Sequence, residues 1–538
     1  MDRTGVARVD ARATPVRRSR APDRCTVRGS VSSGGAPMAH RLVVRPDRDA
    51  FDRLAADWPL VPVWAELLSD IATPVSAFPA VAGDGPGILL ESVERSERWG
   101  RYSFVAGDPA AILVVDAAGL HLRAVARELP TGEPSRRLTP REALRAAVHR
   151  LRAPRLEGLP PITGGLMGYA AYEAATLLDG HPVPHADEAP CPPIGFLLID
   201  RAVVFDHWRQ RLVLVTHVPA GRYDDGIHAL EELAGKLAGA SGLPLMRAGE
   251  AGEGGEGDGD ANMDDDRYRQ IVSAFKEHIL AGDVYQAVPS RRVTFPAPDG
   301  GLPIYRRLRV SNPAPYMFYL RMLGMELAGS SPEPLVRVEG RRVTARPIAG
   351  TRPRGRSDAS DRLLEHELLA DPKERAEHAM LVDLARNDLG RVSEPGTVRP
   401  TELMQVERFT RVMHIVSTIE GDLRQDMEPF DALAVTFPAG TVTGAPKRRA
   451  MELIAEHEPD ARGAYAGAVG YLTFAGDLDF CITIRTVVVA RGSASVQTGA
   501  GVVSDSDPQT ELRETKAKAS ALIPAVAPAG SAGSGGGP

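Results

Sequence analysis

Cysteine, long apolar runs and an excess of positive charge are all missing or scarce in this sequence. Only three cysteines occur in 538 residues, Cys25, Cys191 and Cys481, and their wide spacing argues against a disulfide framework or a zinc site. No apolar run approaches the ~18 residues that a transmembrane helix needs. Lysine and arginine number 64 against 70 aspartates and glutamates, so the basic excess of nucleic-acid-binding proteins is absent. We therefore expect a soluble cytoplasmic protein that binds neither nucleic acid nor membranes.

Changes of composition along the chain predict two folded parts with three disordered segments. The first 37 residues are rich in arginine and lack the apolar segment of a secretory signal, so we interpret them as a leader that is not translated if synthesis starts at Met38. A run from Ala248 to Asn262 consists almost wholly of Gly, Glu, Asp and Ala and is too polar to be buried. The predicted segments are a leader (1–37), an N-terminal domain (40–245), a linker (246–263), a C-terminal domain (264–525) and a tail (526–538).

Hydrophobic periodicity predicts a mixture of helices and strands in both parts. The stretch from Asp479 to Val489 partly alternates, as in one half-buried antiparallel strand. Short connections at 476–477 and 491–492 are typical of hairpins, so the α+β class is predicted rather than a doubly wound sheet. The expected helices are 140–148, 265–281, 371–387 and 510–523, and the expected strands are 111–116, 211–217, 343–346, 468–474, 479–489 and 494–498.

Two pairs of glutamates have a spacing that places both members on one face of a helix. These pairs, Glu374/Glu377 and Glu511/Glu514, both lie in predicted helices. If the two helices present their acids to one cleft, they form an oxygen-only site suited to Mg²⁺. The alternative is two solvated helix faces, because glutamate is mostly exposed in proteins.

The stretch from Phe437 to Lys447 is not a nucleotide-binding loop. No glycine immediately precedes Lys447, so the P-loop pattern fails, and a generic Mg²⁺-dependent phosphotransferase loses its support. The hydroxyls of the stretch, including that of Thr441, instead suit a small molecule that carries a carboxylate.

Three further features have two readings on local grounds. The glycines of Gly499-Ala-Gly501 allow backbone amides to approach an anion, although glycine-rich strand ends are common. His414 lies in an apolar stretch, where a histidine is more often a core residue than a functional one. Arg485 ends an apolar strand and requires a carboxylate partner, which either the protein or a substrate can supply.

Motifs in the second part occur in one fixed order that resembles the chorismate-utilising enzymes. They are Gly282-Asp-Val-Tyr-Gln-Ala-Val288, Ser331-Pro-Glu-Pro334, Pro347-Ile-Ala-Gly-Thr-Arg-Pro353, Val382-Asp-Leu-Ala-Arg-Asn-Asp388, Thr443-Gly-Ala-Pro-Lys447, Cys481-Ile-Thr-Ile-Arg485, Gly499-Ala-Gly501 and Glu511-Leu-Arg-Glu514. In the first part, Leu89-Leu-Glu-Ser92 and Gly100-Arg-Tyr-Ser-Phe104 are similar to anthranilate synthase component I. The resemblance implies antiparallel sheets stacked as an α/β/β/α sandwich with flanking helices. It also implies an N-terminal regulatory part and a C-terminal chorismate-binding part.

Two positions distinguish the members of this family by their chemistry. Members that add water to chorismate place a lysine base where this chain has Gln286, which cannot take a proton. Aminodeoxychorismate synthases that use a covalent lysine carry it where this chain has Ala349, which cannot attack. The resemblance therefore favours direct addition of ammonia and loss of pyruvate, the anthranilate synthase reaction of tryptophan biosynthesis. An aminodeoxychorismate synthase and a catalytically silent tryptophan-binding regulator remain as alternatives.

The resemblance also implies a role for each site residue. Glu377 and Glu514 should ligate Mg²⁺, the expected cofactor, and Glu374 and Glu511 should hold metal-bound waters and orient the site. The acid that protonates the leaving C4 hydroxyl is expected to be Glu333. The catalytic set is completed by His414, which would assist the elimination of pyruvate, and by Thr441. The residues expected to bind the carboxylates of chorismate are Gly350, Thr351, Tyr465, Arg485, Gly499, Ala500, Gly501 and Lys518.

Partners and regulation follow from the resemblance as well. No cysteine-centred glutaminase motif occurs, so the use of glutamine would need a separate glutamine amidotransferase subunit that supplies ammonia. We expect a heterotetramer of two large and two small subunits that L-tryptophan inhibits. The residues expected to line the inhibitor site are Ser92, Asn312, Pro315, Tyr316 and Met317.

Overall fold

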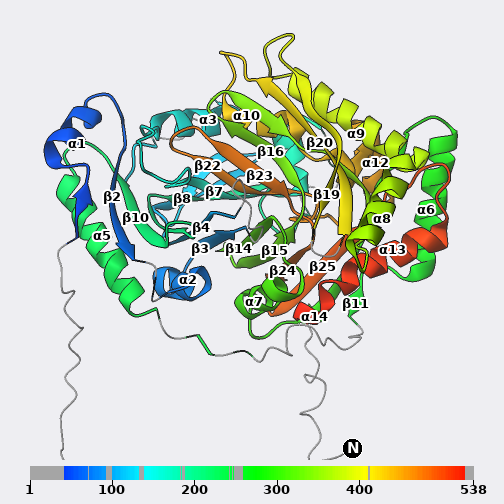
Figure 1. Cartoon of the computed structure of the whole chain (residues 1–538), viewed down its shortest axis with the longest axis horizontal. Helices are drawn as coiled ribbons and strands as arrows, with labels where there is room; N and C mark the ends of the chain where they lie inside the picture. The colour runs from blue at the N-terminus through cyan, green and yellow to red at the C-terminus, as the bar shows by residue number, and fades with distance from the viewer. Residues whose placement is uncertain are drawn as a thin grey trace, which may run out of the picture. The chain divides into compact units, whose positions relative to one another are not determined.

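Two large antiparallel β-sheets, stacked on each other and covered by helices, form the frame of the protein (Figure 1). The computed structural model describes residues 42–68, 70, 72–92, 100–131, 138–181, 183, 188–240, 243–244, 246, 259–409 and 412–526. In this part the chain forms one compact unit that begins at Leu42. The predicted leader, most of the predicted linker and all but the first residue of the predicted tail lie outside the described residues.

The first sheet combines strands from both halves of the sequence. The two halves join where β3 pairs with β14, with Leu89 opposite Tyr319. In spatial order its twelve strands, counted over the described residues, are β1 (Val44–Arg45), β2 (Val61–Leu68), β10 (Arg211–Val218), β9 (Arg201–Asp206), β4 (Tyr102–Gly107), β3 (Gly87–Glu91), β14 (Tyr316–Met322), β15 (Met325–Ser331), β24 (Thr486–Ala490), β25 (Ser493–Gly499), β13 (Ser290–Pro296) and β11 (Asp260–Ala261).

The second sheet is mixed in the same way, because β7 pairs with β22 along its full length, with Gly168 opposite Gly470. Its strands, within the described residues, run in the order β18 (Ile348–Pro353), β20 (Val412–Asp422), β17 (Arg342–Ala345), β16 (Pro334–Glu339), β23 (Leu478–Ile482), β22 (Ala468–Thr473), β7 (Gly165–Ala170), β8 (Ile194–Ile199), β5 (Ala111–Asp116) and β6 (Gly119–Arg123), with β19 (Arg399–Arg408) paired to β20. A separate short pair joins β12 (Gln286–Ala287) to β21 (Gly444–Ala445).

Apolar side chains fill the space between the two sheets and the space beneath the helices on each outer face. Phe104 and Phe318 of the first sheet and Leu197 and Val469 of the second belong to the same buried cluster. Helices α1 (Arg48–Ala55), α2 (Pro74–Ala82), α5 (Tyr223–Ala238), α7 (Gly301–Ser311) and α14 (Ile523–Val526) cover the first sheet. Helices α3 (Pro140–Arg150), α4 (Ala175–Leu178) and α10 (Pro429–Thr436) cover the second. The predicted α/β/β/α sandwich is therefore confirmed.

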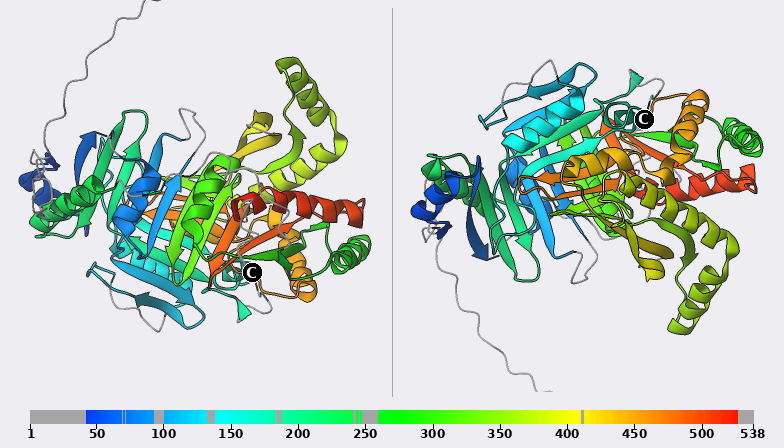
Figure 2. Two further views of the ribbon diagram at one scale, coloured as in Figure 1. Left: turned by 90° about the horizontal axis from the view of Figure 1, so that it is seen from below. Right: turned by 90° about the horizontal axis from the view of Figure 1, so that it is seen from above.

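A further group of helices lies at the side of the molecule opposite α1 and α5 (Figures 1 and 2). Its members are α6 (Asp265–Leu280), α8 (Asp358–Ala370), α9 (Pro372–Gly390), α12 (Lys447–His457) and α13 (Pro508–Ser520). The short helix α11 (Gly440–Thr443) contacts α9 and α12, and the short helix η1 (Tyr172–Ala174) directly precedes α4. Pro372 and Pro508 each occupy the first turn of their helix, where proline is favoured, and Asp371 and Asp507 cap the two helices. No helix in the described residues is long and apolar enough to span a membrane.

The predicted helices and strands are confirmed to within a few residues, with one exception. The stretch from Asp479 to Val489 is not a single strand. It divides into β23, which belongs to the second sheet, and β24, which belongs to the first. Arg485 lies at the break with a φ of 50°, a left-handed conformation that ends strand geometry. Apolar alternation continues across the break, so the sequence pattern did not reveal it.

The composition boundary at 246–263 does not separate the two sheets. Strands from the predicted N-terminal and C-terminal parts occur in both of them. The contacts that hold these parts together are therefore complete sheet ladders rather than a surface between two bodies.

Candidate active site

Two neighbouring segments cross from one sheet to the other and carry a charged side chain at the crossing. The crossing from β15 to β16 contains Glu333, and the crossing from β23 to β24 contains Arg485. The Ser330 amide donates to the Arg485 carbonyl at 3.1 Å, and the Ile482 amide donates to the Glu333 carbonyl at 3.0 Å. Because the crossings are bonded side by side, both side chains line the same cavity.

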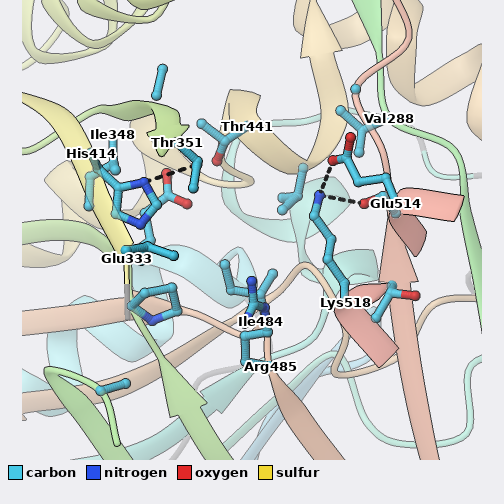
Figure 3. A pocket seen from close by; sticks show the side chains of 18 of the residues that line it. Val288, Glu333, Ile348, Thr351, His414, Thr441, Ile484, Arg485, Glu514 and Lys518 are labelled. Carbon is cyan, nitrogen blue, oxygen red and sulfur yellow. Dashed lines mark hydrogen bonds and ion pairs between the residues drawn. The ribbon is translucent and has the colours of Figure 1, made fainter. Parts of the chain in front are cut away.

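This cavity has a volume of about 380 Å³ and gathers most of the residues predicted from the sequence. Figure 3 shows Glu333 and His414 on one side of it and Glu514 and Lys518 on the other. Three predicted residues, Glu374, Ala500 and Glu511, are not in its lining. The predicted chorismate, catalytic and metal residues that do line it are Glu333, Gly350, Thr351, Glu377, His414, Thr441, Tyr465, Arg485, Gly499, Gly501, Glu514 and Lys518.

Glu333 has the protonation behaviour of a general acid. Burial raises the pKa of Glu333 to about 7, although Thr441 and Lys518 act in the opposite direction. The Thr441 hydroxyl lies beside this carboxyl and, as a donor to it, lowers the pKa of Glu333 relative to burial alone. The carboxyl therefore holds a proton for part of the time at neutral pH.

His414 is a neutral base whose tautomer is fixed by the neighbouring strand. Its Nδ1 lies 3.0 Å from the Gly350 carbonyl and 3.1 Å from the Thr351 hydroxyl. A carbonyl oxygen can only accept, so Nδ1 carries the proton and Nε2 remains an acceptor. Burial lowers the pKa of His414, and Arg485 acts in the same direction, while the bond to Gly350 opposes them.

Gly350 is required at the place where β18 bends toward His414. The pairing of β18 with β20 shifts by one residue between Ala349 and Thr351, a β-bulge, and Gly350 has a φ of 70°. A Cβ at this position would lie 3.1 Å from Glu374 Oε2 and 3.1 Å from Leu368 Cδ1. The bulge turns the Gly350 carbonyl toward Nδ1 of His414. Glycine suits this position because it adopts a left-handed φ readily and has no Cβ to crowd Glu374 and Leu368.

Arg485 has no acidic partner in the described part of the chain. Burial lowers the pKa of Arg485, and no neighbouring carboxylate raises it. The left-handed conformation of this residue is uncommon for an arginine, and such strain is concentrated at functional sites. Of the two readings that the sequence left open, the structure therefore favours a ligand carboxylate over a protein acid.

Glu377 on α9 and Glu514 on α13 line the cavity, whereas Glu374 and Glu511 on the same helices lie outside its lining. Burial raises the pKa of Glu377, and the charges of Glu374 and Glu514 add to the rise. Glu514 pairs with Lys518 at 2.7 Å, and Glu374 pairs with Arg352 at 3.0 Å. Burial also raises the pKa of Glu511.

These acids fit the part that a protein usually plays in holding Mg²⁺. The described residues contain no group of three or more His, Cys, Asp or Glu side chains that could hold a metal. Mg²⁺ is commonly held by one or two carboxylates, with waters and the substrate as its other ligands. Glu377 and Glu514 could supply those carboxylates, and a cation between them would relieve the repulsion that raises the pKa of Glu377.

Two glycines at the end of β25 allow a close approach between the backbone and its neighbours. A Cβ at Gly499 would lie 2.9 Å from the Tyr465 hydroxyl, and one at Gly501 would lie 2.6 Å from Gln286 Nε2. Lys518 Nζ donates to the Gly499 carbonyl at 2.9 Å and thereby ties this segment to α13. The wall of the cavity here is made of backbone rather than side chains, as a site for an anion requires.

A second cavity of about 300 Å³ adjoins the first along the segment 312–317. Ser92, Pro315, Tyr316 and Met317 line it, as the sequence predicted for the inhibitor site, and Pro315 lines both cavities. The buried Ser92 hydroxyl has no hydrogen-bond partner among the described residues. Asn312 differs from this prediction, because it lines the first cavity, where its Nδ2 donates to Ser330 Oγ at 3.0 Å. Ser330, near the end of β15, thus holds the Asn312 side chain in the first cavity.

Gln497 and Phe409 are among the residues of the first cavity that sequence reasoning missed. Gln497 lies two residues before Gly499 on the same strand, so strand alternation places both on one face and could have identified it. The ring of Phe409 lies 5.5 Å from that of His414, and no sequence signal pointed to it.

Comparison with known proteins shows which family the chain belongs to. Residues 104–524 match the family described as chorismate binding enzyme. The chain belongs to this family. It is 45% identical over 501 residues to anthranilate synthase component 1 of Streptomyces coelicolor. This alignment covers 91% of this chain and 93% of that protein. It is 41% identical over 523 residues to the component 1 protein of Mycolicibacterium smegmatis, covering 94% and 97%.

The fold of this chorismate-binding enzyme is also similar to that of a solved structure. Anthranilate synthase component I from Streptococcus pneumoniae superposes with a TM-score of 0.67 at 31% identity and covers 85% of this chain and 99% of that chain. The resemblance drawn from the motifs is confirmed, and the chain is a chorismate-utilising lyase.

Alanine at position 350 should destabilise the protein more than alanine at position 340. Both glycines have a left-handed φ, 70° and 60°, but a Cβ at 340 meets nothing within 4 Å. Backbone strain should cost about 1 kcal/mol at each position, and steric crowding should add roughly 1–3 kcal/mol at Gly350 alone. Urea unfolding of Gly350→Ala and Gly340→Ala measures the difference, and equal losses would show that the contact with Glu374 and Leu368 relaxes freely.

Proposed function

We propose that this chain is the large subunit of an anthranilate synthase, which aminates chorismate with ammonia and eliminates pyruvate to give anthranilate. The observation that carries the proposal is the identity of two residues in the cavity lining. Gln286 and Ala349 both line the cavity, at the positions where the water-adding and covalent members of the family use a lysine. Ammonia needs neither a base to activate it nor a covalent intermediate, so its direct addition is the reaction that these residues permit.

Substrate binding would use the positive and backbone donors of the cavity. Arg485 offers a planar fork, without a protein partner in the described residues, to the pyruvyl carboxylate of chorismate. The amides around Gly499 to Gly501, Lys518 and Tyr465 would bind the ring carboxylate side. Mg²⁺, when bound, would neutralise the ring carboxylate and withdraw charge from the ring.

Glu333 would act as the acid in the first step. Hydroxide is a poor leaving group at neutral pH, so the C4 hydroxyl must receive a proton as ammonia adds at C2. A carboxyl group with a pKa near 7 still carries that proton at neutral pH. The Thr441 hydroxyl, which lines the cavity beside Glu333, would help to orient the leaving oxygen.

His414 would act in the second step, the loss of pyruvate. Its Nδ1 proton is held by the Gly350 carbonyl, so Nε2 is free to accept the C2 proton as the ring becomes aromatic. The pKa of His414 is lowered by burial, so the imidazole is neutral at the pH where Glu333 begins to lose its proton. An acid with a raised pKa and a base with a lowered pKa in one cavity are the arrangement that acid–base catalysis needs.

Ammonia would come from a partner subunit. Among the described residues the two cysteines, Cys191 and Cys481, are buried, and burial raises the pKa of the Cys191 thiol to about 12. Such a thiol is a poor nucleophile, so it does not serve glutamine hydrolysis. The name "component 1" of the relatives implies a second component. We infer a glutamine amidotransferase subunit in this role, in an assembly of two large and two small subunits.

The assay that tests the proposal contains chorismate and ammonium, with or without Mg²⁺. We expect equal amounts of anthranilate and pyruvate in the presence of Mg²⁺ and neither product after its removal. Aminodeoxychorismate as the product would instead identify an aminodeoxychorismate synthase, and no consumption of chorismate would leave a silent regulator. Glu377→Gln and Glu514→Gln should each lower activity by about 10–100-fold at limiting Mg²⁺, whereas Glu420→Gln, near the end of β20 and outside the cavity lining, should not.

The pH dependence should have a falling limb that belongs to Glu333. With a pKa of about 7, the acid loses its proton above neutral pH, so kcat/KM for chorismate at constant free ammonia should fall roughly tenfold per pH unit above pH 7. The rising limb, along which His414 loses its proton and becomes a base, should lie below the ordinary histidine value because burial lowers the pKa of His414. Glu333→Gln should lose about 10²–10⁴-fold in rate together with the falling limb. A limb that persists in this variant would assign the acid to another group.

We infer that L-tryptophan binds in the second cavity and inhibits the enzyme. The cavity combines aromatic and apolar walls with the Ser92 hydroxyl, which has no hydrogen-bond partner among the described residues, and it shares Pro315 with the first cavity. A ligand shifts a conformational equilibrium only by its differential affinity for the two states. Bound tryptophan should therefore weaken chorismate binding, and chorismate should weaken tryptophan binding to the same degree.

Filling the second cavity should abolish inhibition and spare catalysis. Ser92→Phe adds a ring where the inhibitor would bind, so ammonia-dependent activity should stay within about 3-fold of the wild type while tryptophan no longer inhibits. Ser92→Ala is the matched control, because it removes only the hydroxyl and should weaken inhibition by about one hydrogen bond, or roughly 3–10-fold. Unchanged inhibition of an active Ser92→Phe variant would place the inhibitor elsewhere.

A further inference from the structure

A buried ion pair behind the first cavity contacts several of the segments that form its wall. The side chains of Arg462 and Glu458 are 2% and 4% exposed, and neither lines the cavity. Nε of Arg462 donates to Oε2 of Glu458 at 2.9 Å, and Nη2 donates to Oε1 at 2.6 Å. Removing two charges from water costs several kcal/mol, so such a pair is a weak stabiliser, and its geometry is the better guide to its role.

The remaining donors of Arg462 hold two strips of backbone that line the cavity. Nη1 donates to the Val442 carbonyl at 2.8 Å, and Nη2 donates to the Val288 carbonyl at 2.7 Å. Both valines line the cavity, and Val442 directly follows Thr441, the residue beside Glu333. The guanidinium also lies 5.5 Å from the ring of Tyr465, a third lining residue.

Glu458 extends the same network to another lining residue. Its Oε1 accepts hydrogen bonds from the Ser290 amide at 2.7 Å and from the Ser290 hydroxyl at 2.9 Å. The Ser290 hydroxyl in turn accepts from Nε2 of Gln497 at 2.9 Å, and Gln497 lines the cavity. One ion pair thus connects the Thr441 segment, the Val288 segment and the side chain of Gln497.

Only an arginine can make this set of contacts. The planar guanidinium has donors in three directions and here uses them on one carboxylate and two carbonyls. A lysine keeps the charge and could still pair with Glu458, but its single nitrogen cannot also reach both carbonyls in the same geometry.

We propose that Arg462 is a positioning residue of the active site. Through the Val442 carbonyl it sets the distance between Thr441 and Glu333, and through Glu458 and Ser290 it sets the side chain of Gln497. This inference rests on the proposed function. It assigns the placement of Gln497 to chorismate binding and the placement of Thr441 beside Glu333 to the acid step.

Arg462→Lys tests the branch that leads to Thr441. Because Thr441 lowers the pKa of Glu333, its displacement should raise that pKa, and the falling limb of the pH profile should move to higher pH. We expect kcat to fall about tenfold, as for a misplaced catalytic group. Arg391→Lys is the matched control, because Arg391 makes a two-bond pair with Asp179, at 2.7 and 2.6 Å, away from the cavity lining. A loss of folded protein alone would scale the rate without moving the limb.

Ser290→Ala tests the branch that leads to Gln497 and is mild enough to preserve folding. The variant keeps the amide bond to Glu458 and loses only the hydroxyl that holds Gln497. The KM for chorismate should rise about 3–10-fold, with kcat and the position of the falling limb unchanged. Unchanged KM in this variant overturns the proposal, as does a folded Arg462→Lys protein with the pH limb and kcat of the wild type.

Direct binding separates this proposal from the proposed function. If the wild-type protein bound chorismate in calorimetry but formed no anthranilate, the proposed function would fail. The positioning role would then be decided by affinity alone, with Ser290→Ala and Arg462→Lys expected to bind chorismate more weakly than Arg391→Lys. Equal affinities of all three variants would reject it.

Discussion

The site depends on two adjacent crossings between the stacked sheets. A chain that passes from one sheet to the other must leave its ladder, and the groups at the crossing are then free to point into the gap. Here the crossing from β15 to β16 lies beside the crossing from β23 to β24. Two backbone hydrogen bonds join them, from Ser330 to Arg485 and from Ile482 to Glu333. Glu333 and Arg485, which has no acidic partner among the described residues, are therefore held by hydrogen-bonded backbone on both sides, the kind of fixed placement that the proposed catalytic roles require.

The periodic features of the site could be predicted from the sequence, and the crossings could not. Helix spacing correctly predicted that Glu374/Glu377 and Glu511/Glu514 share helices, because i, i+3 geometry is local. The break at Arg485 depends on which sheet each half of the stretch 479–489 joins, which is a long-range choice. The left-handed φ of this residue is imposed by those ladders, and an arginine gives no sign of it in advance. The role of Glu333 followed only from the family resemblance, and its burial could be judged only from the structure.

The division into two parts shows the same limit. A polar, glycine-rich segment was reasonably read as a boundary, since it cannot be buried. Strand pairing depends on partners that lie far apart in the sequence, such as β3 with β14 and β7 with β22, and composition does not reveal it. The predicted regulatory and catalytic parts therefore share hydrogen-bonded strands, which offers a shorter route between two cavities than a hinge would.

That route can be followed through named contacts. In the second cavity the Tyr316 hydroxyl donates to Asp479 at 3.1 Å, which joins the start of β14 to β23. Burial raises the pKa of Asp479 to about 6, so this bond involves a carboxyl that has been taken out of water. From there β23 leads directly to the Arg485 crossing, and β14 leads through its hairpin with β15 to the Glu333 crossing. A ligand that moves Tyr316 would thus act on the strands that lead to the Glu333 and Arg485 crossings. Because packed strands shift as units, a small displacement at one end of either strand reaches the charged side chain at the other.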